Sequence, residues 1–291
     1  MLTDSHAHLD FLTEGRTIKE VLFDAQEAGI NKIICIGTSI EASKKSIEIS
    51  EKYSGDDLQI YATCGIHPQD GKSEVEKLGL IHCFKTLKQA AQSSKKVVAL
   101  GECGLDYYTD PTGERPATTE EEKGFQRELF KKQIKLAADL NLPLVVHCRN
   151  AWDEVFEILE REQGPTLPET PPFDKTQDRQ SRSFNLRGVF HSWTGNVETM
   201  KKALEIGFYI SFSGIVTFKN AQDIQESAKI VPLDRILIET DSPFLAPEPL
   251  RGKQNEPKNV RIIAAFLASL RNEKIEAIEK AVSENFSALF L

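Results

Sequence analysis

The feature that most constrains the fold is a rhythm of short apolar, β-branched runs separated by segments with helical periodicity. Eight such runs occur, at residues 2–8, 32–37, 59–67, 97–102, 143–148, 187–192, 208–214 and 236–241. Runs of this kind predict buried strands, and strands that alternate with helices form parallel sheets. A (β/α)₈ barrel takes ~250 residues. We therefore expect an α/β fold, a single-domain TIM barrel over residues 1–291.

Two of the intervening segments show how helices would cover such a barrel. Residues 17–29 and residues 123–140 both repeat apolar side chains at helical spacing. The two apolar faces consist of Ile18, Val21, Leu22 and Ala25 in the first segment and of Phe125, Leu129, Ile134 and Leu136 in the second. These faces are expected to pack against the outside of the strands.

One segment, from about residue 163 to 185, breaks the rhythm. It is rich in proline and polar residues and has no period of either kind, which predicts a mobile surface insertion. The segment lies between the helix after the fifth strand and the sixth strand. Connections of that kind lie on the face opposite a barrel's active site, so we expect no catalytic role for it.

The charge balance limits how the chain could meet nucleic acid. Its net charge is −8 and its pI is near 5.4. A protein that holds long duplex DNA neutralises many phosphates with Lys and Arg, so an acidic chain is a poor candidate for that mode. An enzyme that grips a short single-stranded stretch or an end is not excluded, because bound cations can supply positive charge locally.

The termini and cysteines indicate a compartment. The first ten residues, MLTDSHAHLD, contain no apolar run, and no membrane-spanning run follows, so we expect a cytoplasmic protein without a membrane partner. No protein partner is indicated. The five cysteines show no CxxC spacing and are predicted to be reduced core thiols. Cys103 and Cys148 each follow a candidate ligand, so strand alternation points them to the opposite, packed side.

Side chains that can bind metal ions fall where the predicted strands end. The carboxyl ends of all eight strands of a barrel converge on one face, so residues far apart in sequence can meet there. The candidates are His6 and His8 at the first strand, Glu102 at the fourth, His147 at the fifth, His191 at the sixth and Asp241 at the eighth.

Each candidate also has a structural interpretation. His6 and His8 are two residues apart, which aims both imidazoles to one side of a strand, although ordinary polar residues at a strand end are the alternative. Glu102, bordered by glycines, is expected to bridge two cations through its two oxygens; a helix N-cap is the alternative. His147 and His191 end buried runs, where one histidine alone is usually a satisfied core residue. Two such histidines, together with the other candidates, favour a metal site.

The remaining candidates concern catalysis and substrate. Asp241 can bind a cation and also accept the proton of an attacking water, so it and Glu102 are the predicted catalytic residues. Glu239 shares the facing of Asp241 but lies deeper and is expected to give support. His67 and Arg149 are predicted to bind a substrate phosphate, because both can donate to its oxygens. A surface ion pair is the alternative for Arg149.

These residues lie in stretches that resemble the TatD family of metal-dependent deoxyribonucleases, within the amidohydrolase superfamily. The resemblance covers nearly the whole chain. Its matching stretches are DSHAHLD at 4–10, GIHP at 65–68, GECGLDYY at 101–108, PLVVHCR at 143–149, FHSWTG at 190–195 and ETDSPFLAP at 239–247. The chain departs from the family where many relatives have HCFSG, since it has HSWTG at 191–195.

The resemblance implies a two-metal site and a DNA substrate. In it, His6, His8 and Asp241 would bind one divalent ion, His147 and His191 the other, and Glu102 both. Several family members are 3′-to-5′ exonucleases on single strands or damaged ends. Imidazoles and carboxylates suit zinc or manganese, whereas magnesium prefers oxygen ligands, so the metal stays open among the three.

Three functions are compatible with the sequence. The first is phosphodiester hydrolysis in DNA by a two-metal-activated water. The second is hydrolysis of a small amide, lactone or phosphoester; many superfamily members with such activities carry a carbamylated lysine at the fourth strand, where this chain has Glu102. The third is a non-catalytic barrel, which the complete set of six candidates disfavours.

Overall fold

Eight parallel strands form one sheet in which each strand pairs with the next along the chain. The structure is a computed structural model that describes residues 1–11, 15–108, 117–163 and 186–291. The strands are β1 (Leu2–Ala7), β2 (Ile30–Cys35), β3 (Gln59–Cys64), β4 (Val97–Asp106), β5 (Leu144–Arg149), β6 (Gly188–Phe190), β7 (Tyr209–Phe212) and β8 (Ile236–Ile238). A parallel bridge between Ala7 and Ser242 brings the last strand back to the first. The sheet is thus a nearly closed barrel, as predicted.

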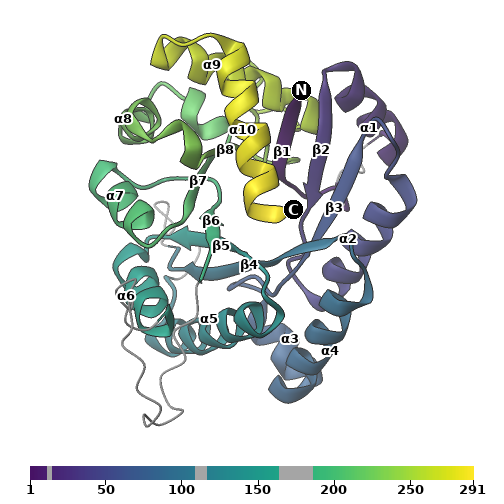
Figure 1. Ribbon diagram of the computed structural model, residues 1–291. Coiled ribbons are helices and arrows are strands. Elements are labelled where there is room, and N and C mark those ends of the chain that lie inside the picture. The colour runs from purple at the N-terminus through teal and green to yellow at the C-terminus, as the bar shows by residue number, and fades with distance from the viewer. Residues whose placement is uncertain (12–14, 109–116, 164–185) are drawn as a thin grey trace, which may run out of the picture.

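Helices follow the strands and surround them (Figure 1). They are α1 (Ile18–Glu27), α2 (Ile40–Tyr53), α3 (Gly71–Leu78), α4 (Leu80–Ser93), α5 (Glu120–Leu140), α6 (Trp152–Gln163), α7 (Val197–Glu205), α8 (Gln222–Ile230), α9 (Val260–Arg271) and α10 (Ile275–Phe290). Short 3₁₀ turns among the described residues are η1 (Gly214–Thr217), η2 (Leu233–Arg235) and η3 (Pro257–Asn259). In the described part of the chain, no helix is both long and apolar enough to cross a membrane.

The helix boundaries follow from local chemistry. Both α1 and α5 begin with a capping box, in which Thr17 and Thr119 accept from the backbone N–H three residues on and a glutamate reaches back to the cap. Their predicted apolar faces are turned inward: Val21, Leu22 and Ala25 of α1, and Leu129, Ile134 and Leu136 of α5, are buried, while Ile18 and Phe125 are partly buried. The predicted insertion at about 163–185 lies, except for residue 163, outside the described residues.

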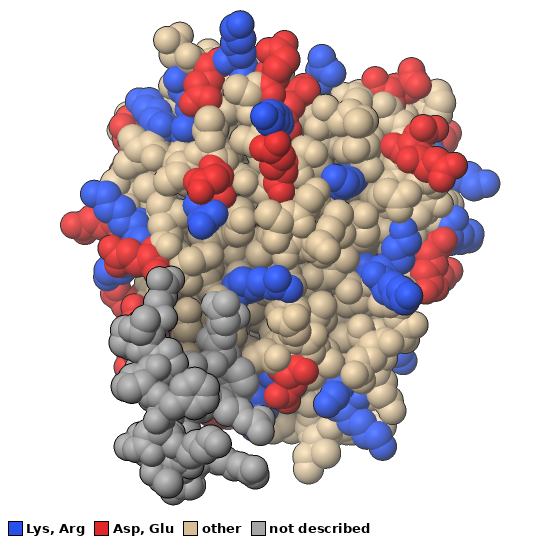
Figure 2. All heavy atoms as spheres, in the orientation of Figure 1, with Lys and Arg blue, Asp and Glu red and all other residues tan. Residues whose placement is uncertain are grey.

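Apolar side chains form two cores. The larger lies between the strands and their surrounding helices. The smaller contains alternate residues of the strands, such as Ile34, Val145 and Leu237, packed against Phe286 and Phe290 of α10. Helix α10 crosses the end of the barrel at which the strands begin, where its Asn285 donates to the Ile236 carbonyl at the start of β8. Figure 2, in the same orientation, shows acidic and basic side chains interspersed over this face.

Candidate metal centre

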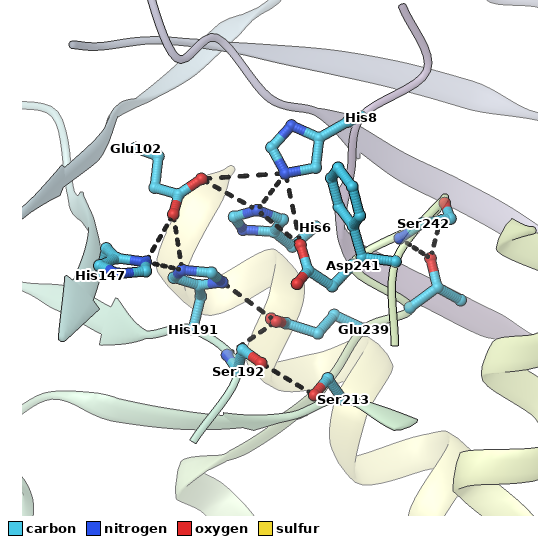
Figure 3. A network of polar contacts seen from close by, with 12 residues as sticks. His6, His8, Glu102, His147, His191, Ser192, Ser213, Glu239, Asp241 and Ser242 are labelled. Atoms are coloured by element: carbon cyan, nitrogen blue, oxygen red, sulfur yellow. Dashed lines mark hydrogen bonds and ion pairs between the residues drawn. The ribbon is translucent and has the colours of Figure 1, made fainter. Parts of the chain in front are cut away.

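The six sequence candidates lie together at the other end of the barrel, where the strands finish (Figure 3). His6 and His147 lie within β1 and β5, whereas His8 and His191 directly follow β1 and β6. Asp241 lies three residues beyond β8. The expectation that Glu102 ends the fourth strand is wrong: β4 continues to Asp106, because residues 103–106 keep pairing with β5.

Close backbone packing between β4 and β5 places Glu102 beside His147. Gly104 pairs with His147 in the sheet, at a φ of 142° that favours glycine. A Cβ at Gly104 would collide with the His147 carbonyl oxygen. The glycines of the GECGLD stretch therefore allow two strands to approach where their polar side chains must meet.

The buried carboxyl group of Asp4 holds the loop that carries Asp241. Asp4 of β1 accepts from the backbone N–H of Thr240 at 2.9 Å and from its hydroxyl at 2.6 Å. Burial raises the pKa of Asp4 to about 8, although the Thr240 hydrogen bonds oppose that shift. Asp241 itself has a φ of 55° and donates its N–H to the His6 carbonyl. The loop is thereby tied to the strand that supplies both histidines.

The first group of donor atoms comes from β1 and the loop after β8. The Nε2 atoms of His6 and His8 are 3.2 Å apart. Asp241 Oδ1 lies 3.5 Å from the His6 Nε2 and 3.3 Å from the His8 Nε2. Donors bound to one tetrahedral zinc ion at about 2.0–2.1 Å would be about 3.3–3.4 Å apart. The spacing of these three atoms therefore fits ligands of a single ion.

The second group comes from β4, β5 and the end of β6. His147 Nδ1 lies 3.2 Å from His191 Nε2. Glu102 Oε1 lies 2.9 Å from each of these nitrogens. This triangle has the size that a second cation needs.

Glu102 joins the two groups, because its oxygens face different partners (Figure 3). Oε1 faces His147 and His191, whereas Oε2 lies 3.4 Å from the His6 Nε2 and 3.9 Å from the His8 Nε2. Its side chain is almost completely buried. A carboxylate in this position can contact two ions at once.

Two further carboxylates orient the second pair of histidines. Asp106 Oδ2 lies 3.1 Å from the His147 Nε2, and Glu239 Oε1 lies 3.3 Å from the His191 Nδ1. Each carboxylate lies beside the ring nitrogen that faces away from Glu102, which is the position from which a carboxylate orients a metal-ligating histidine. Glu239 thus contacts a candidate ligand, and its supporting role stays a prediction. Asp106 escaped the sequence analysis, although its spacing of four from Glu102 gives both the same facing in a strand.

Electrostatics keep the central carboxylates ionised. Burial opposes charge on Glu102, but His191, His67 and His147 outweigh it and hold its pKa well below the usual value. Burial also opposes charge on Asp241, yet the His8 hydrogen bond and the charges of nearby histidines lower its pKa. Ionised carboxylates are the form that binds metal ions.

His67 differs from the other histidines of the centre in its contacts and its pKa. It follows β3, and its Nε2 lies 3.4 Å from Glu102 Oε1. Its Nδ1 accepts from the Gln69 backbone N–H at 3.2 Å, and burial lowers the pKa of His67 to about 4. A neutral ring that accepts at Nδ1 carries its proton on Nε2. His67 therefore presents an N–H toward Glu102, although its Nε2 also lies close enough to Glu102 and His147 to form a third group that could hold a metal ion.

Arg149 lies at the rim. Its side chain is exposed, and its guanidinium carbon lies 4.1 Å from the centre of the Tyr108 ring. Within the described part of the chain it forms no ion pair, so the alternative of a surface ion pair gains no support there. Its charge acts on Asp106, which places it within electrostatic reach of the centre.

The fold and the cluster of imidazoles and carboxylates define the class: a metal-dependent hydrolase on a (β/α)₈ barrel that acts on ester bonds. The family follows from a sequence model described as TatD related DNase, which matches residues 3–291. The chain belongs to this family.

Named relatives agree with this assignment. The chain is 34% identical to the uncharacterized metal-dependent hydrolase YabD of Bacillus subtilis, over 100% of this chain and 99% of that protein. It is 30% identical to the 3′-5′ ssDNA/RNA exonuclease TatD of Klebsiella pneumoniae, over 93% and 90% of the two chains. The crystal structure of YjjV, a TatD homologue from Escherichia coli, superposes with a TM-score of 0.81 at 26% identity, covering 99% and 97% of the two chains.

Proposed function

We propose that the chain is a two-metal phosphodiesterase that hydrolyses DNA, as a 3′-to-5′ exonuclease on single-stranded stretches or ends. The observation that supports this most is the division of Glu102, whose two oxygens face two separate sets of nitrogen donors. A pair of bridged cations suits in-line displacement at a phosphate. The Klebsiella relative, named for exonuclease action on single-stranded DNA and RNA, supports the same substrate class.

The proposed ligands follow the two groups. His6, His8 and Asp241 would hold one divalent ion, His147 and His191 the other, with Glu102 shared. When bound, zinc, manganese or magnesium ions would supply Lewis acidity and lower the pKa of a coordinated water. The nitrogen-rich donor set favours zinc or manganese over magnesium as the resident ion.

The chain's own residues would then supply binding and proton transfer. Asp241, whose pKa is lowered by the neighbouring histidines, would accept the proton of the attacking water. His67 would donate its Nε2–H to a phosphate oxygen, and Arg149 would add charge at the rim. Asp106 and Glu239 would keep His147 and His191 in the tautomers that point a lone pair at the centre.

A nuclease assay tests the proposal directly. End-labelled single-stranded DNA, duplex DNA and RNA would each be incubated with the metal-free protein and with zinc, manganese or magnesium added in turn. We expect stepwise shortening of single-stranded DNA from its 3′ end, with about two ions bound per chain by elemental analysis. Faster hydrolysis of cyclic amides or lactones than of DNA, or no hydrolysis with any ion, would contradict it. The proposed enzyme is a single-domain protein of the cytoplasm.

A further inference from the structure

Two phenylalanines are left half in solvent at the edge of the metal centre. The side chains of Phe11 and Phe244 are 48% and 52% exposed, and the only other exposed phenylalanine among the described residues is Phe23, on α1. Exposing a phenyl ring forgoes hydrophobic stabilisation that burial would provide. Two such rings beside one site therefore need an explanation that packing does not give.

Both rings contact His8. The Phe11 ring lies nearly parallel to the imidazole, with centroids 5.6 Å apart, and the Phe244 ring meets it edge-on at 5.8 Å. The two phenyl rings are 6.4 Å apart at an interplanar angle of 67°. The Nε2 of the same imidazole faces Asp241 and Glu102 (Figure 3). The rings thus form an aromatic edge directly beside the atoms that would act on a phosphate.

The backbone fixes this edge although the side chains are exposed. The Phe11 N–H donates to the His8 carbonyl, and the Phe244 N–H donates to the Asp241 carbonyl. Asn255 holds the Phe244 carbonyl with a 2.8 Å hydrogen bond. The backbone of both residues is therefore fixed relative to the centre before any ligand arrives, which reduces the entropy lost on binding.

Charge near the rings offers little attraction for a phosphate backbone. A cavity of about 690 Å³ that includes Phe11 in its wall is lined by more carboxylates than lysines; its charged residues are Asp10, Glu41, Glu48, Asp70 and Glu74, against Lys44, Lys45 and Lys77. Single-stranded nucleic acids bind through backbone neutralisation and through stacking of bases on aromatic side chains. Where neutralisation of the backbone is weak, base stacking must contribute more of the binding energy.

We propose that Phe11 and Phe244 form a base-stacking subsite, which binds the nucleobase next to the phosphate being cleaved. This inference rests on the proposed nuclease function and deepens it. A planar base can lie against either ring, while its own phosphate reaches the donors beside His8. The enzyme then selects an unpaired nucleotide, because a base inside a duplex has no free face to offer.

The test compares two single-stranded oligonucleotides of the same length, one with ordinary bases and one with two abasic residues at each end. The wild-type ratio of kcat/KM, ordinary over abasic, should be roughly 5- to 150-fold, the range that base stacking on an aromatic ring gives. In Phe11→Ala/Phe244→Ala the ratio should fall toward one. Phe11→Leu/Phe244→Leu should also lose it, whereas Phe11→Tyr/Phe244→Tyr should keep it. Phe23→Ala, an exposed phenylalanine away from the site, should match the wild type.

The outcomes separate the inference from the function it rests on. If the wild type cleaves both oligonucleotides equally, or the leucine pair keeps the ratio, the stacking subsite is wrong and the nuclease function stands. If the wild type cleaves neither oligonucleotide with any added ion, the proposed function fails and takes the inference with it. Urea unfolding of each variant, expected to match the wild type, shows that a lost ratio reflects binding and not misfolding.

Discussion

At the end of the barrel where the strands begin, α10 packs Phe286, Leu289 and Phe290 against apolar interior residues. At the end where they finish, the interior holds imidazoles and carboxylates whose charges stabilise one another. Burying charged groups destabilises a fold unless they are paired, whereas burying phenyl rings stabilises it. The comparison teaches that one end of this sheet stabilises the chain so that the other can hold a reactive cluster.

The largest effect is expected from Glu102→Gln, which keeps the size of the side chain but removes the charge that the two groups share. The proposed two-metal chemistry should lose about 10³–10⁴-fold in kcat/KM, equal to roughly 4–5.5 kcal/mol of transition-state stabilisation. Steady-state kinetics on single-stranded DNA measure the loss. Far-UV circular dichroism should stay unchanged, because Glu102 takes no part in the apolar core.

The matched control is Glu128→Gln, which removes an exposed glutamate on the outer helix α5. It should leave both kinetics and spectrum unchanged. A Glu102→Gln variant that keeps more than about a tenth of the wild-type rate would contradict the bridging role, since several kcal/mol are at stake there.

Phe286→Ala tests the apolar end. Its ring is fully buried between α10 and the strands, so truncation should lower the free energy of unfolding by about 3–5 kcal/mol. Urea denaturation measures that loss, while kcat/KM of the protein that remains folded should not change. Phe23→Ala, which removes an exposed ring, should cost no more than about 0.5 kcal/mol. Equal losses in the two variants would mean that α10 contributes no core.

Much of this architecture is visible in the sequence. All eight strands and the inward faces of α1 and α5 agree with their apolar patterns. The strands are buried on both faces, as continuous apolar runs predict, and the two helices are buried on one. The predicted end of β4 is wrong by four residues. The glycines there allow close pairing with β5, but in a sequence alone glycines indicate the end of a strand. The sequence also does not predict that α10 covers the end of the barrel, because an amphipathic helix has the same pattern whether it packs on the side of a barrel or across its end.

The candidate site divides in the same way. The positions of the six candidate ligands at the ends of predicted strands are enough to group them, because the topology of a barrel brings such residues to one face. The tautomer of His67 depends on one backbone N–H, that of Gln69, and the contact of Phe11 with Phe244 joins positions 233 residues apart. Contacts of this kind depend on how loops fold, so the periodicity of apolar residues in the sequence does not predict them.

Asp106→Asn sharpens the comparison within the polar end, since it alters a residue that contacts His147 on the side facing away from Glu102. Losing the charge behind His147 should weaken cation affinity or kcat/KM by about 10–100-fold, well short of the loss from Glu102→Gln. Calorimetric titration with zinc or manganese and steady-state kinetics measure the two quantities. Asp139→Asn, an exposed aspartate on α5, is the control. A loss as large as that of Glu102→Gln would place Asp106 among the ligands themselves.

The smallest effect is expected from a thiol reagent. Its reaction with cysteines tests whether strand alternation separates the polar centre from the packed outer side of the strands. Cys103 and Cys148 adjoin Glu102 and His147, yet both are buried on the packed side, and burial raises their thiol pKa values. A raised pKa means less of the reactive thiolate at pH 8. Native protein should therefore show almost no reaction with Ellman's reagent, and all five thiols should react in guanidinium. Rapid native labelling that Cys103→Ser abolishes would show that β4 exposes its outer face, and that the polar end is looser than its buried side chains suggest.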